Sequence, residues 1–384
     1  MKRTVPPTVD AVVAGYFGVD LAPGFSSNRN REVARELFRP GRLIETDGLS
    51  VSLGGVVANT GLAMKRFGCR VELMGCIGAD ALGDIAAGLL LDHGVKHGLR
   101  RTQRAGTAYG IVLAPPGMNR IFLEDPGCNG LFTADDIDYD VVRRSRLFHF
   151  GYPTLMRRLW ADGGTELKKM LARVGRLGVA TSMDLSLPDS DSPAGKADWR
   201  AILARVLPHV NIFVPSIEEI LFMLEPQLYG QLVRRLRGRD LIDLVSPEVI
   251  ERLADRILAA GVKVLLIKLG HRGAYVRTGD VATLSSSLAV AIPVENWSHR
   301  SLWVAPYPVD RRRIQNASGA GDCAVAGFLT ALLSGAALER AGQYGMLAGR
   351  DNLYGVDAFS GLRDWKTMTT FLNCRSRQRQ LKIS

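Results

Sequence analysis

The sequence predicts an α/β protein with a doubly wound, mostly parallel sheet, helices on both faces of that sheet, and a small additional β-sheet. Apolar strand-like runs alternate with segments of helical spacing along much of the chain, which is the order typical of parallel sheets. Short strand-like segments outside that alternation indicate the second sheet. Apolar residues make up 47% of the 384 residues, enough to fill the core of one large unit with a small appendage.

The first predicted strand covers residues 9–16 and runs into a glycine turn at Gly15 and Gly18. Further along the chain, apolar residues at helical spacing indicate helices, and short continuous apolar runs indicate buried strands. The elements that follow are a helix at 56–66, a strand at 71–77, a helix at 86–91, a strand at 147–150, a helix at 166–174, strands at 179–185 and 212–215, a helix at 250–260 and a strand at 264–269.

The small sheet is predicted from three short strand-like segments at 43–53, 107–114 and 119–125. Pro115-Pro116-Gly117 supplies a hairpin turn between the last two segments.

We expect one domain over residues 1–384, with two insertions. Stretches at about 225–247 and about 285–313 are longer than a compact protein of this type requires. The first is rich in leucine and arginine and is expected to add a helix.

The net charge of +11 raises the question of a nucleic-acid partner. Basic residues cluster at 234–239, 311–313 and 375–382, but neither a nucleic-acid-binding motif nor interleaved aromatic residues accompany them. We therefore expect no nucleic-acid partner, and an anionic substrate is the simpler explanation of the charge.

The cysteines and the hydropathy exclude other classes of protein. Five scattered cysteines without a Cys-x-x-Cys pair indicate neither a disulfide framework nor a zinc site. No run reaches the roughly 18 apolar residues of a membrane span, and no apolar stretch typical of a signal peptide follows the first residues. We expect a cytoplasmic protein without a membrane partner.

The most informative motif covers residues 316–322 and leads directly into an apolar stretch of helical character. The backbone N–H groups of Gly319, Ala320 and Gly321, at the start of a helix, form an anion hole suited to a phosphate. Asp322 follows closely enough to take a proton from a nucleophile that approaches this anion. Together they predict phosphoryl transfer to a hydroxyl, and the alternative is a capped turn before a helix.

Two other nucleotide-binding patterns do not fit. The next glycine after Gly321 is Gly327, so the dinucleotide fingerprint Gly-x-Gly-x-x-Gly is not matched. The P-loop pattern Gly-x-x-x-x-Gly-Lys-Ser/Thr does not occur in the sequence.

Two motifs of the sequence resemble the signatures of a known family. The run at 316–322 is similar to the carboxy-terminal signature of the ribokinase-like, or PfkB, sugar kinases, whose usual form is Asp-Thr-x-Gly-Ala-Gly-Asp. Residues 54–59 and 75–83 are similar to the amino-terminal signature of the same family, in the same order along the chain. The resemblance implies a ribokinase-like fold with a lid at about 19–55 and 105–130, ATP as phosphate donor, and magnesium.

The resemblance also implies the residues of the acceptor site. Asp20 follows the first strand where family members use an acidic residue to hold sugar hydroxyls, and a carboxylate can accept two hydrogen bonds from neighbouring hydroxyls. Gly54, Gly55 and Asn59 match positions that face the sugar. Without the resemblance, Asp20 reads as a turn residue and Asn59 as a polar residue on a helix surface.

Glu219 matches the acidic residue of the family's Asn-x-x-Glu motif, which organises magnesium and phosphates through water. The Asn of that motif is Ser216 here. The family's first Asp and Thr before the anion hole are Asn316 and Ala317, which removes a charge and a hydroxyl. These changes weaken the expectation of the monovalent-cation site that many members build beside this loop.

Nucleotide contacts are expected at the carboxyl edge of the main sheet. A predicted strand ends at that edge with Lys268, Gly270 and Gly273, and ligands of open α/β sheets bind at such edges. A plain turn after the strand fits these residues as well. Asn352 and Gly355 resemble positions near the adenine pocket.

The sequence therefore predicts an ATP-dependent carbohydrate kinase with a sugar or sugar-like acceptor. Two alternatives stay open: a nucleoside kinase of the same fold, since Phe17, Tyr109 and Tyr152 could stack on a base, and a sugar-binding regulator with little turnover, suggested by Ser216 and the loop substitutions. We also expect a homodimer formed through the lid, because an exposed sheet edge invites strand addition.

Overall fold

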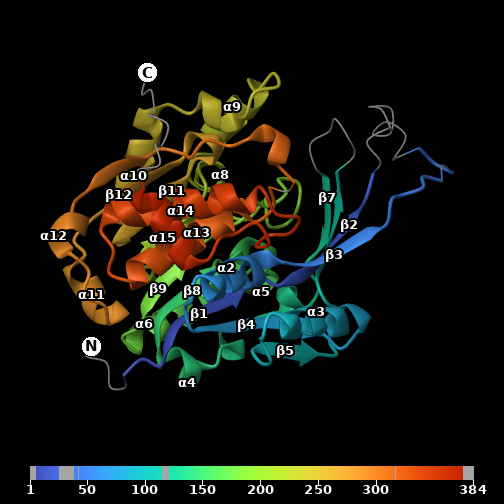
Figure 1. The fold of residues 1–384 in the computed structure, drawn as a ribbon, viewed down its shortest axis with the longest axis horizontal. Helices are drawn as coiled ribbons and strands as arrows, with labels where there is room; N and C mark the ends of the chain where they lie inside the picture. Colours follow the sequence, from blue (N-terminus) through green and yellow to red (C-terminus); the bar gives the residue numbers. More distant parts are fainter. Residues whose placement is uncertain (1–5, 26–38, 42, 115–120, 316, 375–384) are drawn as a thin grey trace.

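The main sheet of the computed structural model confirms the predicted α/β class (Figure 1). The structure describes residues 6–25, 39–41, 43–114, 121–315 and 317–374, and within them this sheet has nine strands in the order β13-β12-β11-β10-β9-β8-β1-β4-β5. All neighbours pair in parallel except where β12 lies antiparallel between β11 and β13. The strands are β1 Val9–Gly15, β4 Val71–Gly78, β5 Leu99–Thr102, β8 Ser145–Gly151, β9 Ala180–Met183, β10 Ile212–Phe213, β11 Val264–Lys268, β12 Ala274–Thr278 and β13 Ser301–Val304.

Helices cover both faces of this sheet because alternate strand residues are apolar on both sides. Val12 and Ala14 of β1 pack on one face, and Ala11 and Val13 pack on the other. The helices are α2 Gly55–Arg66, α3 Ala81–Asp92, α4 Tyr139–Val142, α5 Arg157–Trp160, α6 Thr165–Arg176, α7 Trp199–Val206, α8 Ile217–Leu224, α9 Pro226–Arg234, α10 Pro247–Ala259, α11 Ala282–Leu288, α12 Val294–Trp297, α13 Ala320–Leu333, α14 Leu338–Asn352 and α15 Trp365–Asn373.

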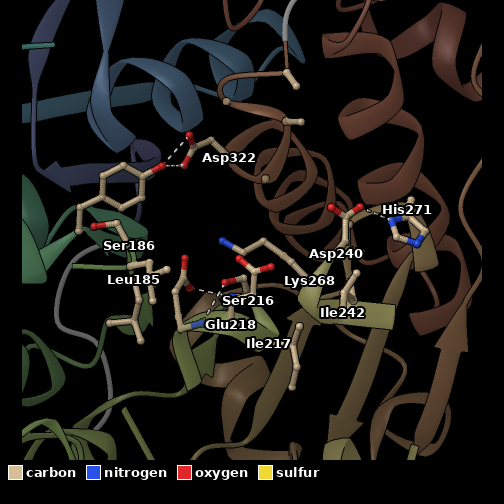
Figure 2. Close-up of a pocket in the computed structure, with 18 residues that line it drawn as sticks. Leu185, Ser186, Ser216, Ile217, Glu218, Asp240, Ile242, Lys268, His271 and Asp322 are labelled. Atoms are coloured by element: carbon tan, nitrogen blue, oxygen red, sulfur yellow. Dashed lines mark hydrogen bonds and ion pairs between the residues drawn. The ribbon is translucent and has the colours of Figure 1, made fainter. Parts of the chain in front are cut away.

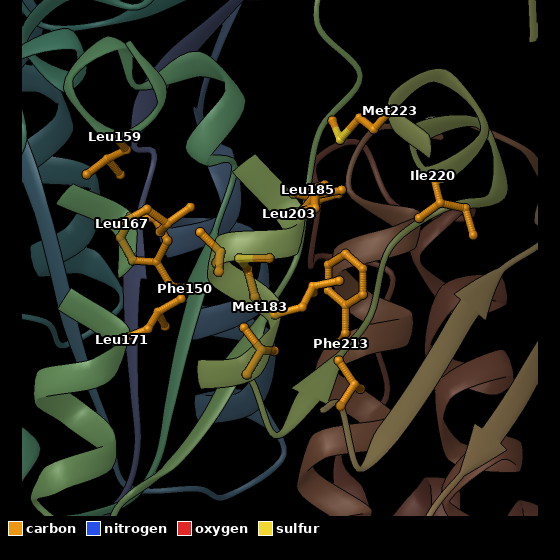
Figure 3. Packing of buried hydrophobic residues seen from close by; sticks show 14 of the residues in the cluster. Phe150, Leu159, Leu167, Leu171, Met183, Leu185, Leu203, Phe213, Ile220 and Met223 are labelled. Atoms are coloured by element: carbon orange, nitrogen blue, oxygen red, sulfur yellow. The ribbon is translucent and has the colours of Figure 1, made fainter. Parts of the chain in front are cut away.

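The first face is buried under α6, α7, α8 and α10, whose leucines and isoleucines interlock with aromatic side chains of the strands. Figure 3 shows Phe150, Met183 and Phe213 packed against Leu167 and Leu203. The opposite face is covered chiefly by α2, α13 and α14. Helix α13 is buried almost all round, which fixes the position of its first turn relative to the sheet.

A separate sheet of four strands, in the order β3-β2-β6-β7, projects from one end of the main sheet (Figure 1). Its strands are β2 Gly18–Pro23, β3 Leu49–Gly54, β6 Tyr109–Leu113 and β7 Ile121–Asp125. It corresponds to the predicted small sheet, and we call it the lid. Its central pair β2 and β6 is parallel, and both outer pairings are antiparallel.

Several predicted boundaries were wrong for local reasons. Residues 43–48 form no strand, and Leu43 is 81% exposed, so the pairing with β2 begins only at Leu49. Gly18 opens strand β2 rather than a turn. Helix α3 begins five residues before the predicted start, because Asp80 accepts a hydrogen bond from the Gly83 N–H as its N-cap. The predicted turn at 115–117 lies outside the described residues.

The two proposed insertions form regular structure. The stretch at 225–247 contains α9, as predicted, and a short 3₁₀ turn at Leu241–Leu244. The stretch at 285–313 contains α12 and β13, the edge strand of the main sheet. That both are insertions in a single domain remains a prediction. No helix in the described part of the chain combines the length and the apolarity that a bilayer crossing requires.

Candidate active site

The loop before α13 has the backbone geometry that an anion hole requires. Gly319 adopts φ +78°, and a Cβ at this position would lie 2.8 Å from the Cβ of Ala358, so glycine is the residue that fits. Helix α13 begins at Ala320, and N–H groups at a helix start attract anions. The Ala320 N–H also makes a 3.4 Å bond to the Ala317 carbonyl, which draws one of the predicted donors toward the protein.

Asp322 lies in the first turn of α13 but does not cap it. The N-cap is Gly319, and the Asp322 carboxylate instead accepts hydrogen bonds from Asn59 Nδ2 at 2.9 Å and from the Tyr152 hydroxyl at 2.8 Å to each oxygen. Burial raises the pKa of Asp322, although the Lys268 charge and the two hydrogen bonds oppose the shift. The structure thus brings α2, the end of β8 and α13 together around one carboxylate.

A buried lysine lies beside this loop. Lys268 Nζ is 2.7 Å from both carboxylate oxygens of Asp184, which is fully buried, and a Cβ on Gly321 would lie 3.7 Å from the same ammonium. Burial alone would lower the pKa of Lys268, but Asp184, Glu219 and Asp322 together raise it. The ammonium is therefore protonated and adjacent to the candidate anion hole.

The loop and the lysine line one pocket of about 480 Å³ (Figure 2). The pocket lies at the carboxyl edge of the parallel strands, as predicted for a ligand of an open α/β sheet. Its lining residues are Tyr152, Leu185, Ser186, Leu187, Ser216, Ile217, Glu218, Glu219, Asp240, Ile242, Lys268, Gly270, His271, Ala317, Gly319, Ala320, Gly321 and Asp322.

Glu219, the predicted magnesium residue, lines this pocket and also secures the start of α8. Its Oε2 accepts the Ser216 N–H at 2.7 Å, while the Ser216 hydroxyl accepts the Glu219 N–H at 3.3 Å. This reciprocal capping box fixes the carboxylate. Ser216 thus has a local structural role at the position where the family has asparagine.

The predicted acceptor residues gather where the lid meets the main sheet. A Cβ on Gly54 would lie 2.6 Å from Asp20 Oδ1, so this glycine leaves room for the carboxylate. Gly55 has φ +82° and lies against the backbone of Tyr16. Burial raises the pKa of Asp20 to about 6, and the charges of Glu124 and Asp322 add to that shift.

The predicted nucleotide residues separate into two groups. Lys268 and Gly270 line the pocket, whereas Gly273, Asn352 and Gly355 do not. The Asn352 amide donates to the carbonyl oxygens of Ser318 at 3.1 Å and Ala358 at 2.6 Å, so it braces the loop before α13. Gly273 and Gly355 lie so close to neighbouring backbone that a Cβ would be only 2.1 Å and 2.4 Å from it. Their nucleotide contacts remain a prediction.

The sequence does not predict the roles of two residues of the site. It suggests Tyr152 only as an aromatic side chain that could stack on a base, and no motif marks Asp184. Both lie near the carboxyl end of a parallel strand, β8 and β9 respectively. Polar residues at such strand ends are the signal that could have found them.

The comparison with protein families now identifies the chain's relatives. Residues 28–350 match the model described as "pfkB family carbohydrate kinase". The chain belongs to the pfkB carbohydrate kinase family. An uncharacterized sugar kinase of Archaeoglobus fulgidus is 23% identical over 286 residues, which cover 74% of this chain and 91% of that protein. Probable fructokinase-4 of Arabidopsis thaliana is 25% identical over 234 residues, or 60% of this chain and 64% of that one.

Solved structures confirm the predicted ribokinase-like fold. A putative ribokinase II from E. coli, in its apo form, has a TM-score of 0.69 and 20% identity, with 95% of this chain and 99% of that chain covered. The ribokinase of Arabidopsis thaliana complexed with ribose and ATP also has a TM-score of 0.69, with 18% identity and 96% and 99% of the two chains covered. This enzyme of the carbohydrate kinase family therefore has the expected architecture.

Proposed function

We propose that this protein transfers the γ-phosphate of ATP to a hydroxyl of a sugar or sugar-like acceptor. The observation that carries the proposal is the position of the Asp322 carboxylate, which Tyr152 and Asn59 hold beside the loop at 319–321. A base next to an anion site is what phosphoryl transfer to an alcohol requires. The family and the structural relative that binds ribose and ATP support the same reaction.

In the proposed reaction, Asp322 removes the proton of the acceptor hydroxyl as the hydroxyl oxygen attacks the γ-phosphorus. Burial raises the pKa of Tyr152 well above its ordinary value, so the phenol keeps its proton and orients Asp322 by donating to it. The N–H groups of the loop and the Lys268 ammonium stabilise negative charge on the transferred phosphoryl group.

The pocket also suits the predicted magnesium ion. Mg²⁺ prefers oxygen ligands and keeps several waters. Glu219 uses Oε2 for the Ser216 N–H, so Oε1 is the oxygen that it can offer to a water on the metal. A bound Mg²⁺ would neutralise phosphate charge during transfer.

A coupled ADP-release assay across sugars and nucleosides tests the proposal. If the protein is a sugar kinase, ADP should be released only when a sugar acceptor is present. A nucleoside kinase would instead turn over the nucleosides faster than the sugars. A regulator would instead show acceptor-induced thermal stabilisation with no turnover, and that result would contradict the proposal.

We expect activity to differ little between sodium and potassium salts at equal ionic strength. Asn316 and Ala317 replace a charged and a hydroxylated residue of the family's loop, and a neutral amide attracts a cation less than a carboxylate does. Asn316 lies outside the described residues. Rates measured in matched NaCl and KCl decide the point, and a large potassium-specific increase would refute the expectation.

Replacing Asp20 by alanine should raise the acceptor KM by roughly 10- to 100-fold, because a hydrogen bond to a charged group contributes about 1.5–3 kcal/mol. The ATP KM should stay within a few-fold, since Asp20 does not line the nucleotide pocket. The matched control is Asp47→Ala, which removes an exposed aspartate that precedes β3. Unchanged acceptor kinetics in Asp20→Ala would remove this residue from the site.

The acceptor kcat/KM should rise with pH around a midpoint near 6. Burial raises the pKa of Asp20 to about 6, so the carboxyl is neutral below that pH and ionised above it. Only the ionised form accepts with both oxygens. A pH profile from 5 to 8 tests this: in Asp20→Asn the contribution of Asp20 should disappear, and the remaining rise should follow the ionisation of Asp322, the base, whose pKa burial also raises.

The lid would serve the proposed reaction by excluding water, which competes as phosphate acceptor.

Dimerisation through the lid also remains a proposal. Its edge strands β3 and β7 expose Leu49, Phe122 and Leu123, of which Leu49 is 58% exposed.

A further inference from the structure

Two carboxylates face each other across a glycine on one face of the lid. In the strand register, Asp20 of β2 is paired with Gly110 of β6, and Gly110 is paired with Glu124 of β7. Residues paired across strands share a face, and two strand spacings place the backbones of Asp20 and Glu124 about 10 Å apart. Gly110 has no side chain, and a Cβ there would lie only 3.1 Å from Asp20 Oδ1. The absence of a side chain at Gly110 therefore leaves room for the Asp20 carboxylate itself, next to Glu124.

One buried polar atom near this row, Asn59 Oδ1, has no hydrogen-bond partner in the described part of the chain, although the amide nitrogen of the same residue donates to Asp322. The Tyr16 hydroxyl lies beside the Glu124 carboxylate, whose charge and hydrogen bonding help to raise the pKa of Tyr16. Asn59 is only 7% exposed, so its Oδ1 lacks the compensation that buried polar groups normally have. A bound ligand would supply it.

The groups along this row and beside it are mostly hydrogen-bond acceptors, and several carry negative charge. Burial raises the pKa of Asp20 and of Tyr16, and the Glu124 carboxylate is the next cause in both cases. Asp322 contributes a further carboxylate. Among the described residues, no arginine, lysine or histidine forms an ion pair with Asp20 or Glu124. A negatively charged ligand would add like charge to this cluster.

We propose that the acceptor carries no negative charge, and that it donates hydrogen bonds from hydroxyl or amino groups to Asp20 and Glu124 across Gly110. The inference rests on the proposed kinase function and narrows its substrate class: sugar acids and sugar phosphates are excluded as acceptors. Glu124 is the residue that determines this specificity, because it is the second carboxylate of the pair and lies on the outer strand of the lid.

The test uses acceptors matched by carbon skeleton: a hexose, its 2-amino derivative, the corresponding hexuronate and the hexose 6-phosphate, with the equivalent pentose set. Binding to the full-length protein is measured by calorimetry without ATP, and turnover is measured by ADP release. We expect the neutral or amino member of a set to exceed its anionic members at least 100-fold in kcat/KM and in affinity. The ratio of kcat/KM for the hexose to kcat/KM for the 2-amino derivative then tells whether a hydroxyl or an amino group donates to the two carboxylates.

Glu124→Gln keeps the size of the side chain and removes its charge. It should raise the acceptor KM several-fold, leave the ATP KM unchanged, and reduce the discrimination against the uronate about tenfold. The control is Glu72→Gln, an exposed glutamate on β4 of the main sheet. Preference for an anionic acceptor, or unchanged discrimination in Glu124→Gln, would overturn the inference.

The two proposals fail in different ways. If no acceptor is phosphorylated, the kinase function fails, but calorimetry with the same panel still tests the charge rule. Binding of neutral or amino members alone supports the rule, and equal or tighter binding of the anionic members refutes it.

Discussion

Replacing Lys268 by methionine is expected to lower kcat about 10²- to 10³-fold, the usual effect of removing one group that stabilises transition-state charge. The ammonium lies beside Gly321 and lines the same pocket as the loop at 319–321. Methionine fills similar space without the charge. The effect should fall mainly on kcat, because charge on the transferred phosphoryl group is redistributed during transfer. Steady-state kinetics with varied ATP measures both parameters.

A loss of stability must be separated from a loss of catalysis. Lys268→Met leaves Asp184 buried without its partner, which costs about 3–5 kcal/mol of folding stability. The double variant Lys268→Met with Asp184→Asn removes both charges and should recover part of that stability, as denaturant unfolding would show. Its kcat should stay low. If the double variant regains both stability and near-normal turnover, Lys268 has only a structural role.

Asp184→Asn alone tests whether Asp184 positions the lysine. The asparagine side chain can still accept one hydrogen bond from Lys268, so a moderate fall in kcat with an unchanged acceptor KM fits a positioning role. The two single variants and the double variant form a cycle that measures the coupling between the two side chains.

Much of the fold follows from local sequence pattern. The alternation of apolar runs with helical spacing predicted strands that become β1, β4, β8 and β11, because a buried parallel strand must be apolar on both faces. Helix boundaries were less predictable, since they depend on single capping residues such as Asp80. Strand β2 was not predicted, because its pairing depends on β3 and β6, which are far away in the sequence.

The candidate site was predictable where one motif contains several of its residues. Gly319, Ala320, Gly321 and Asp322 are consecutive, so their proximity needs no knowledge of the fold. The partners of Asp322 and Lys268 come from other elements: Tyr152 is 170 positions from Asp322, and Asp184 is 84 from Lys268. Local pattern carries no information about such pairings, which the order of strands in the main sheet determines.

Asp322→Asn is expected to lower kcat by roughly 10² to 10⁴, the usual range for removal of a general base. Asparagine keeps the shape of the side chain and can accept one hydrogen bond from Tyr152, but it cannot take a proton. The alternative, in which Asp322 only caps a helix, is disfavoured because Gly319 is the N-cap of α13 and the carboxylate bonds instead to Asn59 and Tyr152.

The Asp322→Asn substitution should preserve or raise folding stability although it lowers kcat. Because burial raises the pKa of Asp322, the folded protein binds this proton more tightly than the unfolded chain does. The contribution of this group to stability is therefore greatest at low pH, and it is lost as the pH rises through the raised pKa. At neutral pH the ionised carboxylate is a cost that asparagine removes, so the Tm of Asp322→Asn should equal or exceed that of the unaltered protein.

Kinetics and melting curves of the same preparation decide between these roles. A low kcat with an unchanged ATP affinity and an undiminished Tm would identify Asp322 as the base. Asn59→Ala is an informative companion, because it removes one of the hydrogen bonds that hold the carboxylate while leaving its basicity in place, and it should lower kcat less than Asp322→Asn does. Near-normal turnover in a well-folded Asp322→Asn protein would refute the mechanism, since no other described carboxylate both lies in the first turn of α13 and lines the pocket.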